Sequence, residues 1–334
     1  MNVSQTIAEI ERIIRSDPAR RGLIASEDRF PPLCPGHLEF AATELAKNGK
    51  AIGIVTGYYV PRANPPAAET DGPLGAAMLA RFLYDIDRKV DLITDRFCAH
   101  TVRVAANAYG LPAGVVRILE LNSDGKLKFD GNGRKPEWSH LISIERSGPA
   151  HTPESFGSNE RGRQRFAELV PQTSWDRCHN MLGGVIDEWT PPLYRLFEVD
   201  SSDDPRPRTI GVGDGGNEIG FGSIAWEDLA RRLPPTSPAC IPCRVSTDWT
   251  IVTGVSNWGG YGLAAAMAVT LGVVDRLLPF DRTHERLALE TLVREGAAVD
   301  GVTARPEPTV DGLPFLTYLQ PWESIRKRLG LTTA

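Results

Sequence analysis

The segment GVGDGGNEIGFG, residues 211–222, sets two carboxylates and an amide in a run that is half glycine. Gly211, Gly213 and Gly216 match the G-x-G-x-x-G pattern of dinucleotide-binding loops, which requires a preceding strand and an uninterrupted following helix. Two further glycines fall where the first turns of that helix would lie, and glycine is a poor helix former. Dinucleotide binding is therefore the weaker interpretation of this segment.

The acidic side chains of the same segment favour a cation over a phosphate. Asp214 and Glu218 would lie beside the phosphates of a nucleotide, where like charges about 4 Å apart cost about 4 kcal/mol at an effective dielectric constant of about 20. Carboxylate and amide oxygens are the ligands that Mg²⁺ and Mn²⁺ prefer, and glycine lets the backbone bring short side chains together. We therefore predict that Asp214, Asn217 and Glu218 bind Mg²⁺ or Mn²⁺; a tight turn with solvated acids is the alternative.

A second polar segment, GYYVPRANPPAAETDGPLGA (57–76), joins a predicted strand to a predicted helix. Thr70 and Asp71 are good N-caps for that helix. A cap does not explain a connection of about a dozen residues, since such loops usually have about two to six. Long loops at the carboxyl ends of parallel strands are where α/β proteins bind ligands. We predict that Glu69 and Asp71 act as metal ligands or as a base, and that Thr70 contacts the substrate.

Other predicted strands are also flanked by polar residues. Because the carboxyl ends of parallel strands share one edge of a sheet, we expect several of these residues to line one cleft. Near the C-terminus, the loop 303–314 adds three more polar residues, Glu307, Thr309 and Asp311, and for each of these a solvated turn is the expected role. The residues that flank strands are Asp95, Glu145, Arg146, Asp248 and the segment 256–260.

Nucleophilic catalysis and zinc binding have little support in the sequence. There is no G-x-S-x-G motif, and the six histidines lie in unrelated contexts. Cys240 and Cys243 form a C-x-x-C motif without a second ligand pair at the spacing of a zinc site. We expect two reduced thiols there.

The elements that would position these residues alternate between strands and helices, which predicts an α/β fold: a layered, mostly parallel or mixed sheet flanked by helices. We expect a single domain over residues 1–334, with two sub-lobes (20–150 and 200–330) left open as a refinement. The polar segment 149–176 is predicted to be a loop or a mobile excursion, and the glycines before residue 262 are predicted to form a turn. The predicted strands are 51–60, 89–95, 140–148, 209–213 and 250–255, and the predicted helices are 74–86, 100–110, 262–274 and 284–296.

Composition narrows the class of partner. The 334 residues carry a formal net charge of -5, which argues against nucleic acid or a membrane surface, since both require basic patches. The N-terminus lacks the basic start and apolar run of a secretory signal, and the apolar run 263–274 is too short to cross a bilayer. We therefore expect a cytoplasmic protein that acts on a small molecule; a homo-oligomer is compatible with the sequence.

Seven motifs resemble the D-glutamate cyclase family in sequence and in order, and the resemblance extends from about residue 20 to 325. The family pattern has an arginine in its N-M-R-G motif, where this chain has Leu182. The motifs are VTGYYVP, PPAAETDGPLGA, IERSG, NMLGG, GDGGNEIGFG, TGVSNWGGYGL and DGVTARPEPTVDGLP.

The resemblance implies a lyase that reversibly dehydrates D-glutamate to 5-oxo-D-proline on an α/β fold, with a divalent metal. In that reaction the α-amine attacks the γ-carboxyl carbon, so the amine must lose protons to a base and the negative carboxylate must be neutralised. The residues that would meet these needs are Glu69, Asp71 and Glu218 as catalytic groups, Arg146 for the α-carboxylate, and Thr70, Asn180 and Asn257 as further substrate contacts.

Three other functions remain open at this point. A metal-dependent hydrolase or lyase acting on another small amino or hydroxy acid would use the same acidic loops. A non-catalytic protein that binds an acidic metabolite would keep the acidic residues without turnover. A nucleotide-binding regulator would bind NAD or ATP without metal.

Overall fold

The computed structural model describes residues 2–18, 23–123, 127–129, 136–198, 206–234 and 238–331. Its centre is a six-stranded sheet in which all neighbouring strands are parallel, in the order β10-β9-β8-β1-β4-β5. The predicted α/β fold with a flanked parallel sheet is thus confirmed. The strands are β1 (Ala51–Thr56), β4 (Lys89–Thr94), β5 (Val116–Ile118), β8 (His140–Ile144), β9 (Arg208–Gly213) and β10 (Trp249–Val252).

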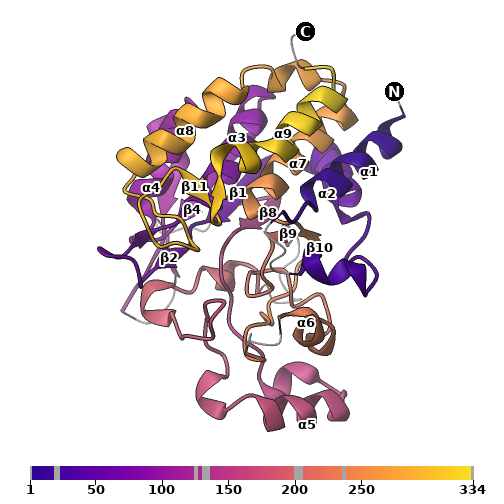
Figure 1. Ribbon diagram of the computed structural model, residues 1–334, viewed down its shortest axis with the longest axis vertical. Helices are drawn as coiled ribbons and strands as arrows, with labels where there is room; N and C mark the ends of the chain where they lie inside the picture. The colour runs from indigo at the N-terminus through magenta and orange to yellow at the C-terminus, as the bar shows by residue number, and fades with distance from the viewer. Residues whose placement is uncertain are drawn as a thin grey trace.

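The two faces of the sheet carry different layers. Successive side chains of a strand point to opposite faces, so Ile52 and Ile54 of β1 pack into a helical core while Val55 packs into a second core. The second core is built mainly from irregular segments and from α6 (Trp226–Arg232), which lie below the sheet in Figure 1. The helices of the first core are α1 (Val3–Ile14), α2 (His37–Asn48), α3 (Pro73–Asp85), α4 (Ala99–Ala108), α7 (Ser256–Leu271), α8 (Arg282–Arg294) and α9 (Phe315–Arg328).

The order of the strands changes direction between β1 and β8. From β1 the chain continues to β4 and β5 on one side, and then returns to β8, β9 and β10 on the other side. Ligands of open α/β sheets bind outside the carboxyl ends of the strands at such a switch point. The topology therefore predicts that residues that follow β1, β8 and β9 line a ligand-binding site. Strands from both predicted sub-lobes belong to this one sheet; the division of the chain into domains stays a prediction.

In the described part of the chain, three pairs of short strands form two-stranded sheets that are separate from the central sheet. β2 (Tyr59–Val60) pairs with β3 (Ala67–Ala68), and β11 (Thr309–Val310) pairs with β12 (Leu313–Pro314), in both cases antiparallel. A third pair joins β6 (Glu120–Leu121) to β7 (Leu127–Lys128).

The predicted glycine-rich turn before residue 262 is wrong, because α7 already begins at Ser256. The glycines allow close packing rather than a turn. A Cβ on Gly259 would overlap Val212 of β9, and a Cβ on Gly260 would lie 2.5 Å from the carbonyl oxygen of Gly75 in α3. Glycine is tolerated here because two neighbouring elements need the space that its side chain would fill.

The segment 149–176 is not the loop that its polarity predicted. It contains α5 (Glu160–Leu169), whose Phe166 is fully buried against Trp226 and Phe156. A small satellite core therefore stabilises this excursion, which extends furthest from the sheet in Figure 1. Of the second polar segment, 201–208, residues 201–205 lie outside the described residues.

The structure also bears on the cysteines and on membrane-spanning helices. All five cysteines are free, in agreement with reduced thiols at Cys240 and Cys243. Among the described residues, no helix has the length and apolar character that crossing a membrane requires.

Candidate active site

A cavity of about 400 Å³ opens at the switch point, beyond the carboxyl ends of β1, β8 and β9. Its walls combine four carboxylates with an apolar mouth. The lining residues are Tyr58, Val60, Pro61, Arg62, Glu69, Glu145, Asn180, Met181, Leu182, Asp214, Gly215, Asn217, Pro234, Gly301, Val302 and Asp311.

The glycine-rich loop after β9 folds its own acid back onto its backbone. The carboxylate of Glu218 is fully buried and accepts N–H groups from Asp214 (3.0 Å), Gly215 (2.8 Å) and Gly216 (2.7 Å). A Cβ on Gly213 would lie 2.6 Å from the Glu218 carboxyl carbon, so this approach requires glycine. The loop therefore uses Glu218 to hold its shape, while Asp214 faces the cavity.

Asp71 caps a helix, but not the one that follows it in sequence. Its carboxylate accepts the N–H groups of Ser256 (2.9 Å) and Asn257 (2.8 Å) at the start of α7, and that of Gly72 (3.0 Å). A negative charge is stabilised at a helix N-terminus, where backbone N–H groups lack partners within the helix. Asp71 thus joins the loop after β3 to the start of α7.

Glu145 follows β8 with an unusual backbone conformation. Its φ of 48° lies in the left-handed region, which is costly for a residue with a side chain. This turn directs the carboxylate toward the cavity, where it accepts a hydrogen bond from the Ser256 hydroxyl at 2.6 Å. The strand end thereby supplies a second cavity carboxylate beside Asp214.

Asp311 reaches the site from the other end of the chain, on the β11–β12 hairpin. Asp311 and Gly312 form its two-residue turn, and both have positive φ (56° and 72°), as the tightest hairpin turns require. Asp300 holds this turn in place by accepting the Gly312 N–H and the Thr309 hydroxyl, each at 2.7 Å.

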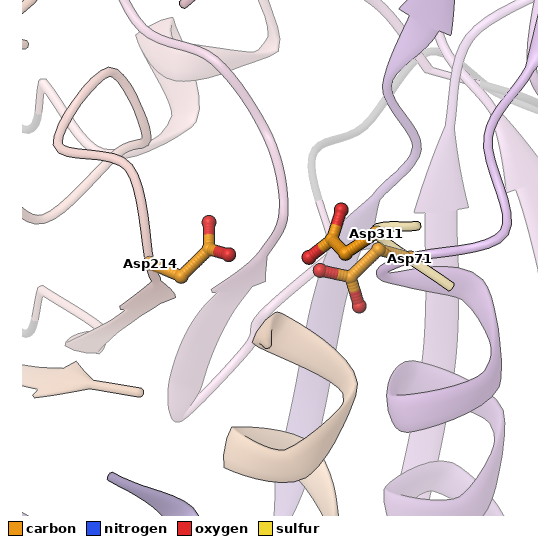
Figure 2. Close-up of side chains that lie close together, drawn as sticks. All are labelled: Asp71, Asp214 and Asp311. Carbon is orange, nitrogen blue, oxygen red and sulfur yellow. The ribbon is translucent and has the colours of Figure 1, made fainter. Parts of the chain in front are cut away.

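Carboxylates from distant loops converge in two overlapping groups. Ligand oxygens of Asp71, Asp214 and Asp311 lie within 4.8 Å of one another, and so do those of Glu145, Asp214 and Glu218. Figure 2 shows Asp214 facing Asp71 and Asp311 across the start of a helix. Asp214 belongs to both groups, so it is the centre of the acidic cluster.

Burial and mutual repulsion dominate the electrostatics of the cluster. Burial raises the pKa of Glu69 well above its usual range, and the charges of Asp311 and Asp71 raise it further. Burial likewise raises the pKa of Asp214, and the negative charges of Asp311 and Glu145 raise it further. The pKa of Glu145 rises for the same reasons. Each of these carboxyl groups is therefore more easily protonated than a solvated one.

The donor set fits a hard divalent cation. Buried carboxylates are costly unless protons, positive side chains or metal ions compensate them. Among the described residues that line the cavity, Arg62 is the single lysine or arginine. Asp71, Asp214 and Asp311 offer three carboxylates within reach of one ion, which suits Mg²⁺ or Mn²⁺.

Asn217, predicted as a metal ligand, and Asn180, predicted as a substrate contact, both line the cavity. The amide nitrogen of Asn217 donates to the Ser147 hydroxyl (3.2 Å) and the His179 carbonyl (2.9 Å), which fixes the orientation of the side chain. The side-chain oxygen of Asn180 accepts the N–H groups of Leu182 and Gly184.

Thr70 and Asn257 are not among the residues that line the cavity, and their contact with substrate stays a prediction. The Thr70 hydroxyl donates to the Thr309 carbonyl at 2.8 Å, which joins its loop to the β11–β12 hairpin. The Asn257 side chain accepts from Gly72 (3.0 Å) and Gly75 (2.6 Å) and donates to the Thr70 carbonyl (3.1 Å). Both side chains hold the loops that carry the acids.

Arg146, which was predicted to bind the α-carboxylate, is held by partners within the protein. Its guanidinium is buried, pairs with Asp95, and donates to the carbonyl oxygens of Gly57 (2.8 Å) and Pro191 (2.7 Å). It does not line the cavity, and its binding of a substrate carboxylate stays a prediction. Two of its partners, Gly57 and Asp95, follow β1 and β4, so Arg146 joins the loops at the carboxyl ends of these strands.

Asp248 also lies away from the site. It precedes β10 at the amino end of the strand and pairs with Arg206 and Arg208 near the surface. Because Asp248 precedes its strand, it lies at the amino end of the parallel sheet, opposite to the cavity.

Three polar side chains of the cavity were missed by the sequence interpretation, which treated Asp311 as a solvated turn and did not single out Tyr58 or Arg62. The Asp-Gly pair at 311–312 was a readable signal, because it is typical of a two-residue hairpin. Tyr58 follows β1 within two residues, but the predicted strand 51–60 included it, so the rule for strand ends did not single it out. No local signal distinguishes Arg62 from other surface arginines.

Known proteins match this chain over nearly its full length. The family described as D-glutamate cyclase-like, C-terminal, matches residues 10–163 and 166–325. The human protein named D-glutamate cyclase, mitochondrial, is 28% identical over 363 aligned residues. That alignment includes 100% of this chain and 53% of the human protein, so the chain spans about half the length of this relative.

Proposed function

This chain belongs to the D-glutamate cyclase-like family, and we propose that it interconverts D-glutamate and 5-oxo-D-proline plus water. The observation that carries this proposal is the cavity at the β1–β8 switch point, where acids from four separate segments converge. The family relation supports an enzyme; the substrate, the lyase reaction and the metal are the proposed part.

The chemistry of the reaction explains why several carboxylates are useful. In the forward direction a C–N bond forms between the α-amine and the γ-carboxyl carbon, and a C–O bond of that carboxyl breaks. The ammonium group loses two protons, and the departing oxygen needs two protons to leave as water. A group that accepts a proton and returns it nearby therefore serves both halves of the reaction.

Glu69 is the best-placed proton carrier. It lines the cavity, and burial with neighbouring negative charge raises its pKa, so its carboxylate is a stronger base than a solvated one. Asp71 and Glu218 each accept three backbone N–H groups. Those contacts fix the positions of the two carboxylates, which suits them to hold a cation or the loops.

Asp71, Asp214 and Asp311 would hold the divalent ion, with Asn217 beside them. Such an ion, when bound, supplies neutralisation of the substrate carboxylate and polarisation of its C=O bond. The walls of the cavity hold the substrate in a folded pose, and bringing amine and carboxyl carbon together is itself a large part of the rate.

A second candidate follows from the apolar mouth of the cavity. Met181, Leu182 and Val302 line it, and Leu182 is 76% exposed. A metal-dependent hydrolase or lyase acting on a larger amino or hydroxy acid would use such a surface.

The cytoplasmic location expected from composition stays a prediction.

The deciding experiment is to incubate the protein separately with D-glutamate, L-glutamate and each 5-oxoproline enantiomer, with Mg²⁺ or Mn²⁺ and with EDTA. Interconversion of the D compounds, lost with EDTA, is the expected result. Conversion of neither D compound would contradict the proposed reaction, and turnover that persists in EDTA would contradict the metal.

A further inference from the structure

The proposed substrate carries two carboxylates into a cavity whose floor is already acidic. One of them is consumed in the ring closure, but the α-carboxylate keeps its charge in both substrate and product. A cation at fixed distance from the reacting groups would stabilise it, and Arg146, which was predicted for this role, is buried against Asp95 and does not line the cavity.

Arg62 has the position that Arg146 lacks. It follows β2 and lines the cavity, and among the described lining residues it is the single lysine or arginine. Its Nη2 donates to the carbonyl oxygens of Gly301 (2.6 Å) and Val302 (2.8 Å). These two bonds anchor one corner of a planar, multidentate donor group, and a guanidinium anchored in this way loses less side-chain entropy when it binds an anion.

Gly301 is a neighbour of both Arg62 and the buried carboxylate of Glu69. Its carbonyl accepts from Arg62, and a Cβ built on it would overlap Oε2 of Glu69. Gly301 therefore lies between the Arg62 guanidinium and the carboxylate of Glu69, to which we assign proton transfer. In folded glutamate the α-carboxylate is attached to the carbon that bears the amine, so a base at the amine and a cation at the α-carboxylate must be close neighbours.

We propose that Arg62 binds the α-carboxylate of the substrate and so determines that the substrate is an α-amino acid with a free carboxylate. This inference rests on the proposed function. Arg62 acts by binding the group that does not react, and Glu69 acts at the amine.

The test compares Arg62→Met with wild type on two substrates, D-glutamate and its α-carboxamide, which keeps the γ-carboxyl group but lacks the α charge. Loss of hydrogen bonds to a charged group predicts a fall of about 10- to 100-fold in kcat/KM for D-glutamate, mainly through KM. The α-carboxamide should be a poor substrate of the wild type and be affected little by the substitution. Arg62→Lys should recover part of the loss, because it restores the charge without the planar donor group.

Arg305→Met is the matched control, since Arg305 lies in the adjoining loop, has a side chain that is 72% exposed and does not line the cavity. It should keep both the rate and the substrate preference. Wild type that converts D-glutamate, together with an Arg62→Met variant that keeps the preference for D-glutamate over the α-carboxamide, would overturn the assignment of Arg62 alone. Wild type that converts neither compound would overturn the proposed function and this inference with it.

Discussion

The carboxylates of Asp71 and Asp214 approach each other within 4.8 Å, together with that of Asp311, although they come from the loop after β3 and the loop after β9. The short distance between like charges is the feature from which the site takes its properties. It implies that a bound cation or bound protons stabilise the folded state. The stability of the protein should therefore depend on both metal concentration and pH.

Replacement of Asp214 by Asn tests the cation. Asp214 belongs to both acidic groups, so the neutral side chain should weaken metal binding and abolish most activity, by at least about 100-fold if the carboxylate is a direct ligand. Mg²⁺ or Mn²⁺ at about 100 times its Kd should stabilise the wild type by about 2.7 kcal/mol, a shift visible in Tm. That shift should be small in the variant.

Asp248→Asn provides the comparison for this measurement, because Asp248 pairs with arginines at the opposite edge of the sheet. Its response to metal should match the wild type. An equal metal response in Asp214→Asn would show that the ion, if any, binds elsewhere.

The pH dependence of stability should have an unusual sign in the absence of metal. Burial and like charges raise the pKa of Glu69, Asp71, Glu145 and Asp214, so the folded protein retains protons that the unfolded chain has lost. Their contribution to stability is complete below the unfolded pKa of about 4 and declines as the pH rises toward the folded values. In EDTA, Tm should therefore fall between pH 5 and pH 8, whereas metal should reduce the slope. A Tm that rises over this range in EDTA would be inconsistent with the buried acids.

The Tyr58 hydroxyl should contribute to catalysis rather than to folding. Tyr58 lines the cavity, and burial raises the pKa of its phenol, as do the charges of Glu69 and Glu145, so it stays a hydrogen-bond donor at neutral pH. Tyr58→Phe should lower kcat by about 10- to 100-fold, the usual scale for one positioned donor to a charged group, with little change in Tm. The neighbouring Tyr59→Phe is its control, because that hydroxyl donates to the Pro66 carbonyl outside the cavity. Equal kinetics in the two variants would exclude Tyr58 from the reaction.

Arg146→Met should destabilise the protein without acting specifically on substrate binding. The substitution leaves Asp95 buried without its partner, and loss of one member of a buried ion pair costs about 3–5 kcal/mol. Urea unfolding should show that loss, and KM of the folded fraction should change little. A raised KM at unchanged stability would instead return Arg146 to the substrate.

Glu218→Gln should affect stability as well as activity. Its two oxygens accept three backbone N–H groups, and an amide presents N–H where one of these donors points. We expect a loss of about 1–3 kcal/mol in the free energy of unfolding from an unsatisfied buried donor, together with reduced turnover. Full stability combined with lost activity would mean that Glu218 acts directly in the reaction.

Sequence alone was enough for the fold class and for the presence of an acidic site. Strand and helix periodicities of segments such as 89–94 and 74–85 are local properties, so they could be read without knowing the neighbours. The excess of acids and glycine at strand ends was equally local, and it indicated Asp71 and Asp214 correctly as members of one cluster.

Only the tertiary structure determined which partners each side chain contacts and whether it faces the cavity. Asp71 caps a helix from a distant part of the chain, Arg146 is neutralised by Asp95, and Asp311 enters the site on a C-terminal hairpin. Each of these outcomes depends on a hydrogen-bond or ionic partner that is remote in sequence. Residue type and spacing specify what a group can do, whereas the partners that pack around it determine whether it faces the cavity.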